Sequence, residues 1–402
     1  MSYFKIIAEH DKGPKGLIAD DVQYINVHTH PLDICNYSPF DKVVQLLNNR
    51  LGWSLIHFFD SLTKKTREAR YVLSFIAENP QILLTAEDLA FDNAVRHLFQ
   101  EGHNLPGKML NVGMTMNFDH AGFGPDFSPE YQYGKQYEAA LDLAKNNRGY
   151  FIPALSIDPR DEHMMERAER HLALGFRVFK IYPSLGFTVY DKKLMDKFYP
   201  WVIEHGGSII THSGTGGFGT IQKRIEVYDE QGERQMMQFK SFWHPKRPEL
   251  KPWFNHPKNW RKVYAVYPQL RVNQAHFGGP GDIADFVHKR AKLDNCTEEI
   301  VWQCENPKYS NKYSDISYTL YDLETNKRIR EHIFKDHPIM RERLMFGTDH
   351  NLVLMDRKID NVFLSFFRYW KTYGEEYIHN LTFRNAYEFL NFLNLQGHPF
   401  GV

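Results

Sequence analysis

The chain has 402 residues, more than most single hydrophobic cores accommodate unless the fold is a barrel. Its 49 basic and 49 acidic residues are interspersed and give a formal net charge of zero, which argues against binding of nucleic acid by charge. Residues 1–12 lack a secretory signal, no segment offers the ~20 apolar residues of a membrane span, and three cysteines make no disulfide framework. We therefore expect a cytoplasmic protein whose partner is a small-molecule substrate.

The first predicted element, residues 24–31, is a short strand that ends in two histidines one residue apart. Side chains two residues apart in a strand point to the same side, so His28 and His30 can direct both imidazoles at one point. Neutral imidazole is the commonest protein ligand for zinc and similar ions. A tripeptide is too short to separate a metal site from two ordinary loop histidines, so the rest of the chain decides.

Four segments after His30 have apolar residues at helical spacing, namely 42–49, 54–62, 65–77 and 86–100. Beyond them the pattern changes, and strand-like segments alternate with helical ones. The predicted strands are 109–117, 150–157, 176–183, 207–212, 270–276, 312–317 and 343–349. The predicted helices between them are 131–146, 161–174, 192–205, 258–267, 281–293 and 327–335.

Eight strands that alternate with helices predict a parallel sheet, and ionisable residues at several strand ends favour a TIM-type (β/α)8 barrel over an open sheet. In such barrels the active site lies at the carboxyl ends of the strands. We treat residues 1–402 as one barrel domain with two insertions. The first is helical and spans about residues 36–108, after strand one, and the second spans 214–255, after strand five.

Ionisable side chains lie on five of the predicted strands and would share one rim of the barrel. A single strand-end histidine is usually structural, and a strand-end aspartate often caps a helix or forms a turn. A lysine inside an apolar strand is less ordinary, because lysine is rarely buried without a partner. Together, these residues predict a metal site: His28, His30, Lys180, His212, His276 and Asp349.

This pattern resembles the amidohydrolase superfamily of metal-dependent (β/α)8 enzymes, and in detail its amidohydrolase-related (amidohydrolase 2) branch, which contains hydrolases and decarboxylases. The shared marks are the His-x-His of strand one, the lysine of strand four, the histidines of strands five and six, and the aspartate of strand eight. The finer motifs are Phe179-Lys180-Ile181-Tyr182-Pro183, Ile210-Thr211-His212-Ser213-Gly214, Ala275-His276-Phe277-Gly278-Gly279, Phe346-Gly347-Thr348-Asp349 and Asn385-Ala386.

The resemblance implies one divalent ion, Zn²⁺ or a similar ion such as Mn²⁺, with His276 beside it as a catalytic residue. A site of this kind keeps a position open for water and lowers the pKa of that water towards ~7. Asp349 would act as general base and then deliver the proton to the leaving group, while His276 would polarise the carbonyl or orient the water. The implied metal ligands are His28, His30, His212 and Asp349.

Lys180 distinguishes two arrangements within the family. In two-metal members the strand-four lysine is carboxylated and bridges the ions, and His212 and His276 then hold the second metal. In this branch the Lys-x-Tyr/His-Pro strand often occurs in one-metal enzymes, where an unmodified ammonium group can meet a substrate carboxylate. We favour one ion and an unmodified Lys180.

The two insertions depart from the compact family pattern. Long connections are uncommon in compact domains and are usually functional. The 214–255 connection is interpreted as a lid over the pocket or, alternatively, as a contact in a homo-oligomer. Gly214, Gly216, Gly217 and Gly219 follow His212 directly and would let backbone approach a ligand or hinge a loop.

Three functions are compatible with this sequence. The favoured one is a metal-dependent hydrolase of an amide, ester or lactone, with a metal-activated water. The second is a metal-dependent decarboxylase of a carboxylate-bearing substrate on the same scaffold. The third is a non-catalytic barrel with a structural metal, which the open ligand set disfavours, because structural zinc sites are usually closed by four protein ligands. The fold does not separate the first two, because one fold hosts many reactions.

Overall fold

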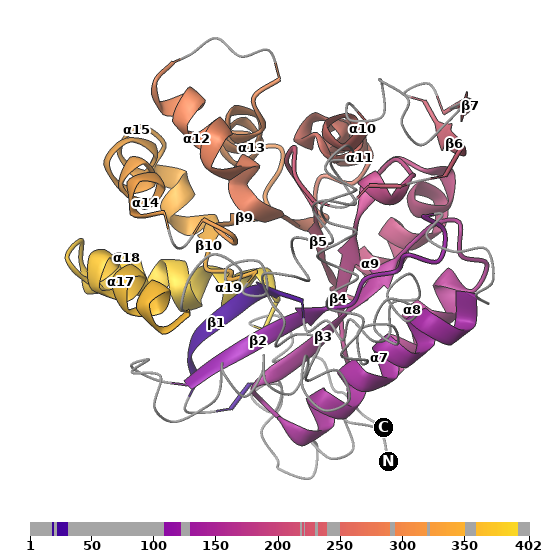
Figure 1. Cartoon of the computed structure of the whole chain (residues 1–402), viewed down its shortest axis with the longest axis horizontal. Helices are drawn as coiled ribbons and strands as arrows, with labels where there is room; N and C mark the ends of the chain where they lie inside the picture. The colour runs from indigo at the N-terminus through magenta and orange to yellow at the C-terminus, as the bar shows by residue number, and fades with distance from the viewer. Residues whose placement is uncertain are drawn as a thin grey trace, which may run out of the picture.

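Eight parallel strands form a nearly closed barrel in the computed structural model, in the order β1-β2-β3-β4-β5-β8-β9-β10 (Figure 1). Each predicted strand is present, and the (β/α)8 prediction is confirmed. The strands are β1 (Val22–Thr29), β2 (Lys108–Met114), β3 (Phe151–Ile157), β4 (Val178–Ile181), β5 (Ser208–Thr211), β8 (Arg271–Gln274), β9 (Lys312–Asp315) and β10 (Leu344–Met345). The structure describes residues 18–19, 22–30, 108–121, 129–217, 219–220, 222–229, 232–238, 250–289, 294–319, 322–349 and 359–392.

The barrel closes where the last strand meets the first. The Val27 amide donates to the Phe346 carbonyl at 3.1 Å, and the His28 carbonyl accepts from the amides of Thr348 and Asp349. The Asn26 side chain supports the same seam, because its amide group donates to Thr348 Oγ1 at 2.9 Å. Strand one and the segment after β10 are therefore tied together at the end where the sequence places His28 and Asp349.

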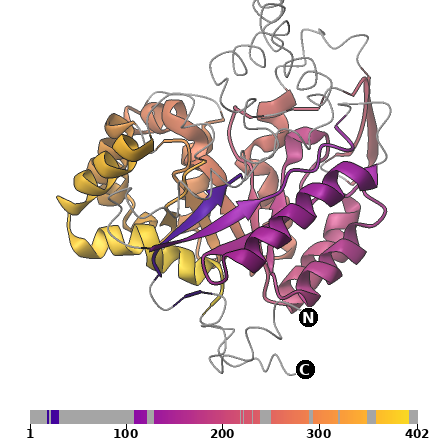
Figure 2. The same cartoon turned by 60° about the horizontal axis from the view of Figure 1, so that its bottom comes forward.

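Helices surround the strands on the outside, as the view in Figure 2 shows. None of the helices in the described ranges combines the length and apolar character that crossing a bilayer requires. The main helices are α7 (Pro129–Asn146), α8 (Met164–Ala173), α9 (Tyr199–Glu204), α11 (Trp260–Val266), α12 (Gly279–Val287), α13 (Cys296–Glu305), α14 (Leu323–Arg328), α15 (Phe334–Asp336), α17 (Ile359–Lys371), α18 (Glu375–His379) and α19 (Asn385–Phe389).

The helix α13 was not among the predicted elements. Its sequence mixes β-branched residues with four polar or charged ones in the first turns, which hides the helical spacing. The local signal was the cap, because the Asn295 side chain accepts a hydrogen bond from the Glu298 amide and Glu298 and Glu299 lie in the first turn. The predicted helix 281–293 corresponds to α12, which ends at Val287.

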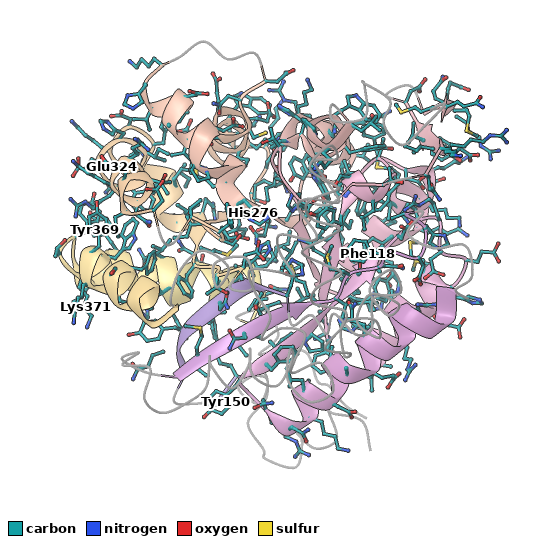
Figure 3. All side chains as sticks on the ribbon, viewed as in Figure 1. Phe118, Tyr150, His276, Glu324, Tyr369 and Lys371 are labelled. Carbon is teal, nitrogen blue, oxygen red and sulfur yellow. The ribbon has the colours of Figure 1, made fainter. Side chains whose placement is uncertain are left out.

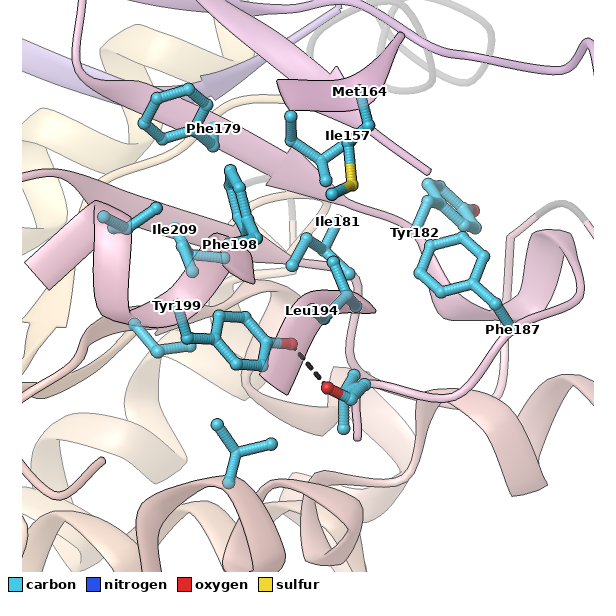
Figure 4. Close-up of a cluster of buried hydrophobic side chains, with 14 of the residues drawn as sticks. Ile157, Met164, Phe179, Ile181, Tyr182, Phe187, Leu194, Phe198, Tyr199 and Ile209 are labelled. Atoms are coloured by element: carbon cyan, nitrogen blue, oxygen red, sulfur yellow. Dashed lines mark hydrogen bonds between the residues drawn. The ribbon is translucent and has the colours of Figure 1, made fainter. Parts of the chain in front are cut away.

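A buried apolar cluster between β3, β4, β5 and the helices outside them determines which way the strand-four lysine points (Figure 4). Phe179 and Ile181 of β4 both belong to this cluster, together with Phe198 and Tyr199. Burying each such side chain contributes about 1.5–3 kcal/mol, so this face of β4 is strongly fixed towards the helices. Lys180 lies between Phe179 and Ile181 in an extended strand, and its side chain therefore points into the barrel.

The connection after β5 contains an antiparallel hairpin of β6 (Arg224–Tyr228) and β7 (Arg234–Gln238), followed by α10 (Leu250–Asn255). The hairpin lies at the periphery of the molecule, at the upper right of Figure 1, and β7 is largely exposed. The predicted helices 42–49, 54–62, 65–77 and 86–100 lie outside the described residues, as does most of the 36–108 insertion.

His171, on α8, makes the folded state sensitive to acid. The ring is fully buried; its Nδ1 lies 2.8 Å from the Tyr137 hydroxyl and its Nε2 lies 3.1 Å from the Val178 carbonyl. Burial lowers the pKa of His171 to about 3, against ~6.5 in an unfolded chain. Between these values only the unfolded state binds the proton, so stability is fully present above pH ~6.5 and falls as the pH drops towards 3.

We expect the free energy of unfolding to fall by up to about 1.4 kcal/mol per pH unit below pH 6.5 on account of His171. Urea titrations between pH 7.5 and 4.5 measure this slope. His171→Asn is less stable at pH 7.5, but its stability falls less steeply with acid than that of the wild type. His163→Asn, at an exposed position of the preceding turn, keeps the wild-type slope. Equal slopes for His171→Asn and the wild type would contradict this account.

Candidate metal centre

The structure brings together ligand atoms from the two ends of the chain at the carboxyl rim of the barrel. One ligand atom from each of His28, His30 and Asp349 lies within 4.8 Å of the others, and all three side chains are buried. A second group of the same kind joins His28 to His276 and Asp315. The labelled His276 lies near the middle of the molecule in Figure 3, beside the ends of the strands.

Asp349 is held against strand one by its own backbone. Its amide donates to the His28 carbonyl at 2.8 Å, and its backbone has a left-handed conformation, with φ of 46°. Gly347 permits this close approach, because a Cβ at that position would lie 2.8 Å from the Cβ of His28. The barrel seam therefore positions the carboxylate beside the His-x-His pair.

The His28 ring is oriented by a carboxylate on the side away from the group. Its Nδ1 lies 3.1 Å from Asp315 Oδ2, and both side chains are fully buried. Its Nε2 is buried and has no hydrogen-bond partner among the residues that the structure describes. A buried imidazole nitrogen without a partner is costly unless it binds something, and a histidine oriented by a carboxylate is the usual arrangement of a metal ligand. The residues therefore fit a divalent ion.

His30 has the protonation state that a metal ligand needs. Its Nδ1 lies 3.2 Å from the Met114 carbonyl, which favours the tautomer with the proton on Nδ1. Burial lowers the pKa of His30 well below 6.5, and the nearby charges of Lys180 and His28 lower it further. At neutral pH the ring is therefore uncharged, with the Nε2 lone pair available to a cation.

His212 contacts His276 rather than the His28–His30–Asp349 group. Its Nδ1 lies 3.1 Å from His276 Nε2, and its Nε2 lies 3.2 Å from the Gly216 carbonyl. Its ring stacks on Tyr182, with centroids 4.4 Å apart. The loop folds over His212 closely, because a Cβ at Gly217 would lie 2.6 Å from His212 Nε2. In this loop conformation the Gly216 carbonyl lies against Nε2 of His212, the nitrogen that would bind a metal.

His276 lies between two of the other histidines and a serine. Its ring centroid is 4.7 Å from those of both His28 and His212, and its Nδ1 lies 2.8 Å from Ser317 Oγ. Burial lowers the pKa of His276 to about 3, and the charge of His28 lowers it while that of Asp315 opposes the shift. The ring is therefore neutral at pH 7, so that it can donate a hydrogen bond through one nitrogen only.

Lys180 is fully buried inside the barrel, and its ammonium nitrogen has no hydrogen-bond partner within the described part of the chain. Burial lowers the pKa of Lys180 to about 8, against the opposing pull of Asp315 and Asp349. The centroid of the Tyr182 ring lies 5.4 Å from Nζ. A buried ammonium group of this kind stabilises an anion that enters the site.

Asp349 shows the opposite shift. Burial raises its pKa above the ordinary value of an aspartate, and the charges of His28 and Lys180 only partly offset this effect. A divalent cation beside the carboxylate would favour its ionised form. The state of Asp349 as a base is therefore coupled to occupancy of the metal position.

Asp315 is a buried residue of the candidate site that sequence reasoning missed. It is the last residue of β9, the seventh barrel strand, and it is fully buried. Burial alone would raise its pKa, but the charge and hydrogen bond of His28, with smaller contributions from His276 and Ser317, lower it below its ordinary value. The available signal was its position at the end of a strand. Strands one, five, six and eight end in a histidine or an aspartate, and the seventh strand likewise ends in an aspartate.

The comparisons with known proteins agree with this architecture. The amidohydrolase family model of the amidohydrolase-2 branch matches residues 112–397. The 5-carboxyvanillate decarboxylase of Novosphingobium aromaticivorans, whose structure contains manganese, is 11% identical, with a TM-score of 0.51 and coverage of 94% of this chain and 98% of that chain. At this identity the likeness shows the fold alone. A search of curated proteins gives no match.

Two further solved structures have TM-scores below 0.5. A probable 2-pyrone-4,6-dicarboxylic acid hydrolase of Acinetobacter baumannii is 11% identical, with a TM-score of 0.47 and coverage of 92% of this chain and 100% of that chain. An uncharacterised TIM-barrel protein of Bordetella bronchiseptica is 14% identical, with a TM-score of 0.48 and coverage of 93% and 99%. Because the family model spans more than half of the sequence, the chain belongs to the amidohydrolase-2 family of metal-dependent TIM-barrel enzymes.

Proposed function

We propose that this enzyme hydrolyses an amide, ester or lactone bond with one divalent metal ion, Zn²⁺ or a similar ion, and with Asp349 as the general base. The observation that supports it best is the buried His28 Nε2, which has no partner in the described ranges and belongs to a group of close ligand atoms with His30 and Asp349. A structural zinc ion is usually held by a closed tetrahedral set of four protein ligands. The close group supplies three ligands in this conformation, and with His212 as a fourth ligand a water would take a fifth position, an expansion that catalytic sites can undergo.

His28, His30 and Asp349 would hold the ion, and His212 would be the fourth ligand once its Nε2 exchanges the Gly216 carbonyl for the metal. The bound ion would supply Lewis-acid activation of water and of the scissile carbonyl. This exchange gives the glycines after His212 a specific role, because the loop that carries Gly216 must shift for His212 to bind.

The chain's own residues would then handle the proton. Asp349 in its ionised form would accept a proton from the attacking water and deliver it to the leaving group. His276 is neutral at pH 7, and because its Nδ1 faces the Ser317 hydroxyl that donates to Asp315, its Nε2 would carry the lone pair and orient the water as an acceptor rather than by carrying charge. Ser317 fixes the plane of that ring through its contact with Nδ1.

Lys180 favours a second candidate, a decarboxylase on the same scaffold. An unpaired ammonium group inside the barrel would bind the carboxylate of a substrate. The two reactions are separated by their products. A panel of lactones, esters, amides and aromatic carboxylic acids is incubated with the metal-loaded enzyme, and release of carbon dioxide is measured beside the formation of new acid. Acid without carbon dioxide supports hydrolysis, and carbon dioxide without incorporation of solvent oxygen supports decarboxylation.

We expect Lys180 to be an unmodified amine and the enzyme to hold one ion. Lys180→Gln should then keep one metal per chain while kcat/KM for a carboxylate-bearing substrate falls by ~10²-fold, the scale of losing a buried charged hydrogen bond of 2–3 kcal/mol. Metal is counted by elemental analysis with and without added bicarbonate. Two metals in the wild type that drop to one or none in Lys180→Gln would instead indicate a carbamate bridge.

A further inference from the structure

Asp315 faces five N–H or O–H groups on two sides of the site. On one side its Oδ2 accepts from Asn273 Nδ2 at 2.7 Å and contacts His28 Nδ1 at 3.1 Å. On the other side its Oδ1 accepts from the backbone amides of His276 and Ser317, at 3.1 and 3.0 Å, and from the Ser317 hydroxyl. The side chain is fully buried.

The Oδ2 side determines the tautomer of His28. Both Asp315 oxygens accept hydrogen bonds, Oδ2 from the Asn273 side chain and Oδ1 from two backbone amides and the Ser317 hydroxyl, so that the carboxylate acts as an acceptor. The hydrogen between Oδ2 and Nδ1 is therefore donated by His28, and in the neutral imidazole that binds a metal Nε2 then carries the lone pair. Nε2 is the nitrogen that lacks a partner, and so the carboxylate presents the correct atom to a metal.

The Oδ1 side supports the backbone that carries His276. His276 and Phe277 both have left-handed backbones, with φ of 70° and 48°, which residues with side chains rarely adopt. Asp315 Oδ1 accepts a hydrogen bond from the backbone amide of His276. It also accepts one from the Ser317 hydroxyl, whose oxygen contacts His276 Nδ1. One carboxylate therefore fixes both the backbone and the ring plane of His276.

We propose that Asp315 is a positioning residue that places the metal ligand His28 and the catalytic His276 at the same time, through its two oxygens. The proposal rests on the proposed function, because it assigns a purpose to the orientation of His28 only if a metal binds there. It adds a residue of the seventh strand to a site that was predicted from residues on strands one, four, five, six and eight.

The informative substitution is Asp315→Asn, which keeps the size of the side chain and changes only its hydrogen-bonding pattern. The remaining oxygen is expected to keep the backbone amides of His276 and Ser317. The new amide group then faces His28 Nδ1 and donates to it, which moves the ring proton to Nε2 and removes the metal-binding lone pair. We expect affinity for Zn²⁺, measured by competition with a chelator, to fall 10- to 100-fold.

Two companion variants separate this effect from folding. In Asp315→Asn the amide group also meets the Asn273 amide, so two donors face each other. The exchange variant D315N/N273D restores a hydrogen bond between these positions in the reverse sense and keeps the net charge. We expect it to recover the melting temperature of the metal-free protein but not the affinity for Zn²⁺. Ser317→Ala leaves the contact of His28 with Asp315 intact, and we expect it to keep wild-type affinity for Zn²⁺ while turnover falls.

The outcomes distinguish this proposal from the function on which it rests. A wild type that binds no Zn²⁺, Mn²⁺ or Co²⁺ defeats the proposed function itself. If the wild type binds metal and a folded Asp315→Asn or exchange variant binds Zn²⁺ with the same affinity, the role of Asp315 is overturned while the proposed function stands. If both variants fail to fold, the metal-bound wild type still decides, because a crystal structure with the ion on His28 Nδ1 overturns the proposal and one with the ion on Nε2 supports it.

Discussion

Asp349→Asn is expected to lower turnover by ~10²-fold or more while the protein keeps its fold and at least part of its metal. The amide has nearly the size of the carboxylate and can still offer an oxygen to the ion, but it cannot accept a proton from water. The backbone contacts that hold this residue, above all the hydrogen bond from its amide to the His28 carbonyl, do not involve the side chain. The loss should therefore appear in kcat with little change in melting temperature.

The matched variant for Asp349→Asn is His276→Asn, which also tests the number of ions. With one ion, His276 is not a ligand, and the variant loses activity but keeps its metal. With two ions, His276 holds the second, and the metal content falls together with activity. A folded, metal-bound Asp349→Asn enzyme with nearly full activity on its identified substrate would rule out Asp349 as the base.

The double variant His28→Ala/His30→Ala is expected to lose metal binding. Both rings belong to the close group with Asp349, and both are buried. Removing an outer partner of a ligand costs 10- to 100-fold in metal affinity, and removing two ligands should cost at least ~10²-fold. Elemental analysis after dialysis against a weak chelator measures the occupancy.

A suitable control for the double variant is His163→Ala, since this histidine is exposed on the surface near α8. It should keep the wild-type metal content, which separates loss of the site from loss of histidine in general. Unchanged occupancy in His28→Ala/His30→Ala would show that the ion binds elsewhere, and the proposed centre would then be wrong.

The barrel and part of the site were predictable because strand periodicity is a local property. His28 and His30 share one side of a strand by their spacing alone, and Phe179 and Ile181 direct Lys180 inward because apolar residues alternate with it. The order of the strands then places their ends on one rim. These inferences need only the pattern of residues along the chain and the rule for parallel barrels.

The orientation of individual rings was not predictable, because it depends on contacts between distant segments. His212 is expected to be a metal ligand with His28, His30 and Asp349, and its position in the sequence does not indicate that the Gly216 carbonyl lies 3.2 Å from its Nε2. In the sequence, Asp315 is recognisable only as an aspartate at the end of a strand. Its proposed role depends on its contact with His28, which is 287 residues away in the sequence. A hydrogen bond over that separation leaves no signature in a single sequence.

The most direct test of the account is a crystal structure of the wild-type protein grown with Zn²⁺, with anomalous diffraction recorded on both sides of the zinc absorption edge. The account predicts one anomalous peak, ~2.0–2.2 Å from His28 Nε2, a His30 nitrogen and an Asp349 oxygen, beside an unmodified Lys180. A peak bound by other residues, or two peaks bridged by a carbamate on Lys180, would contradict it.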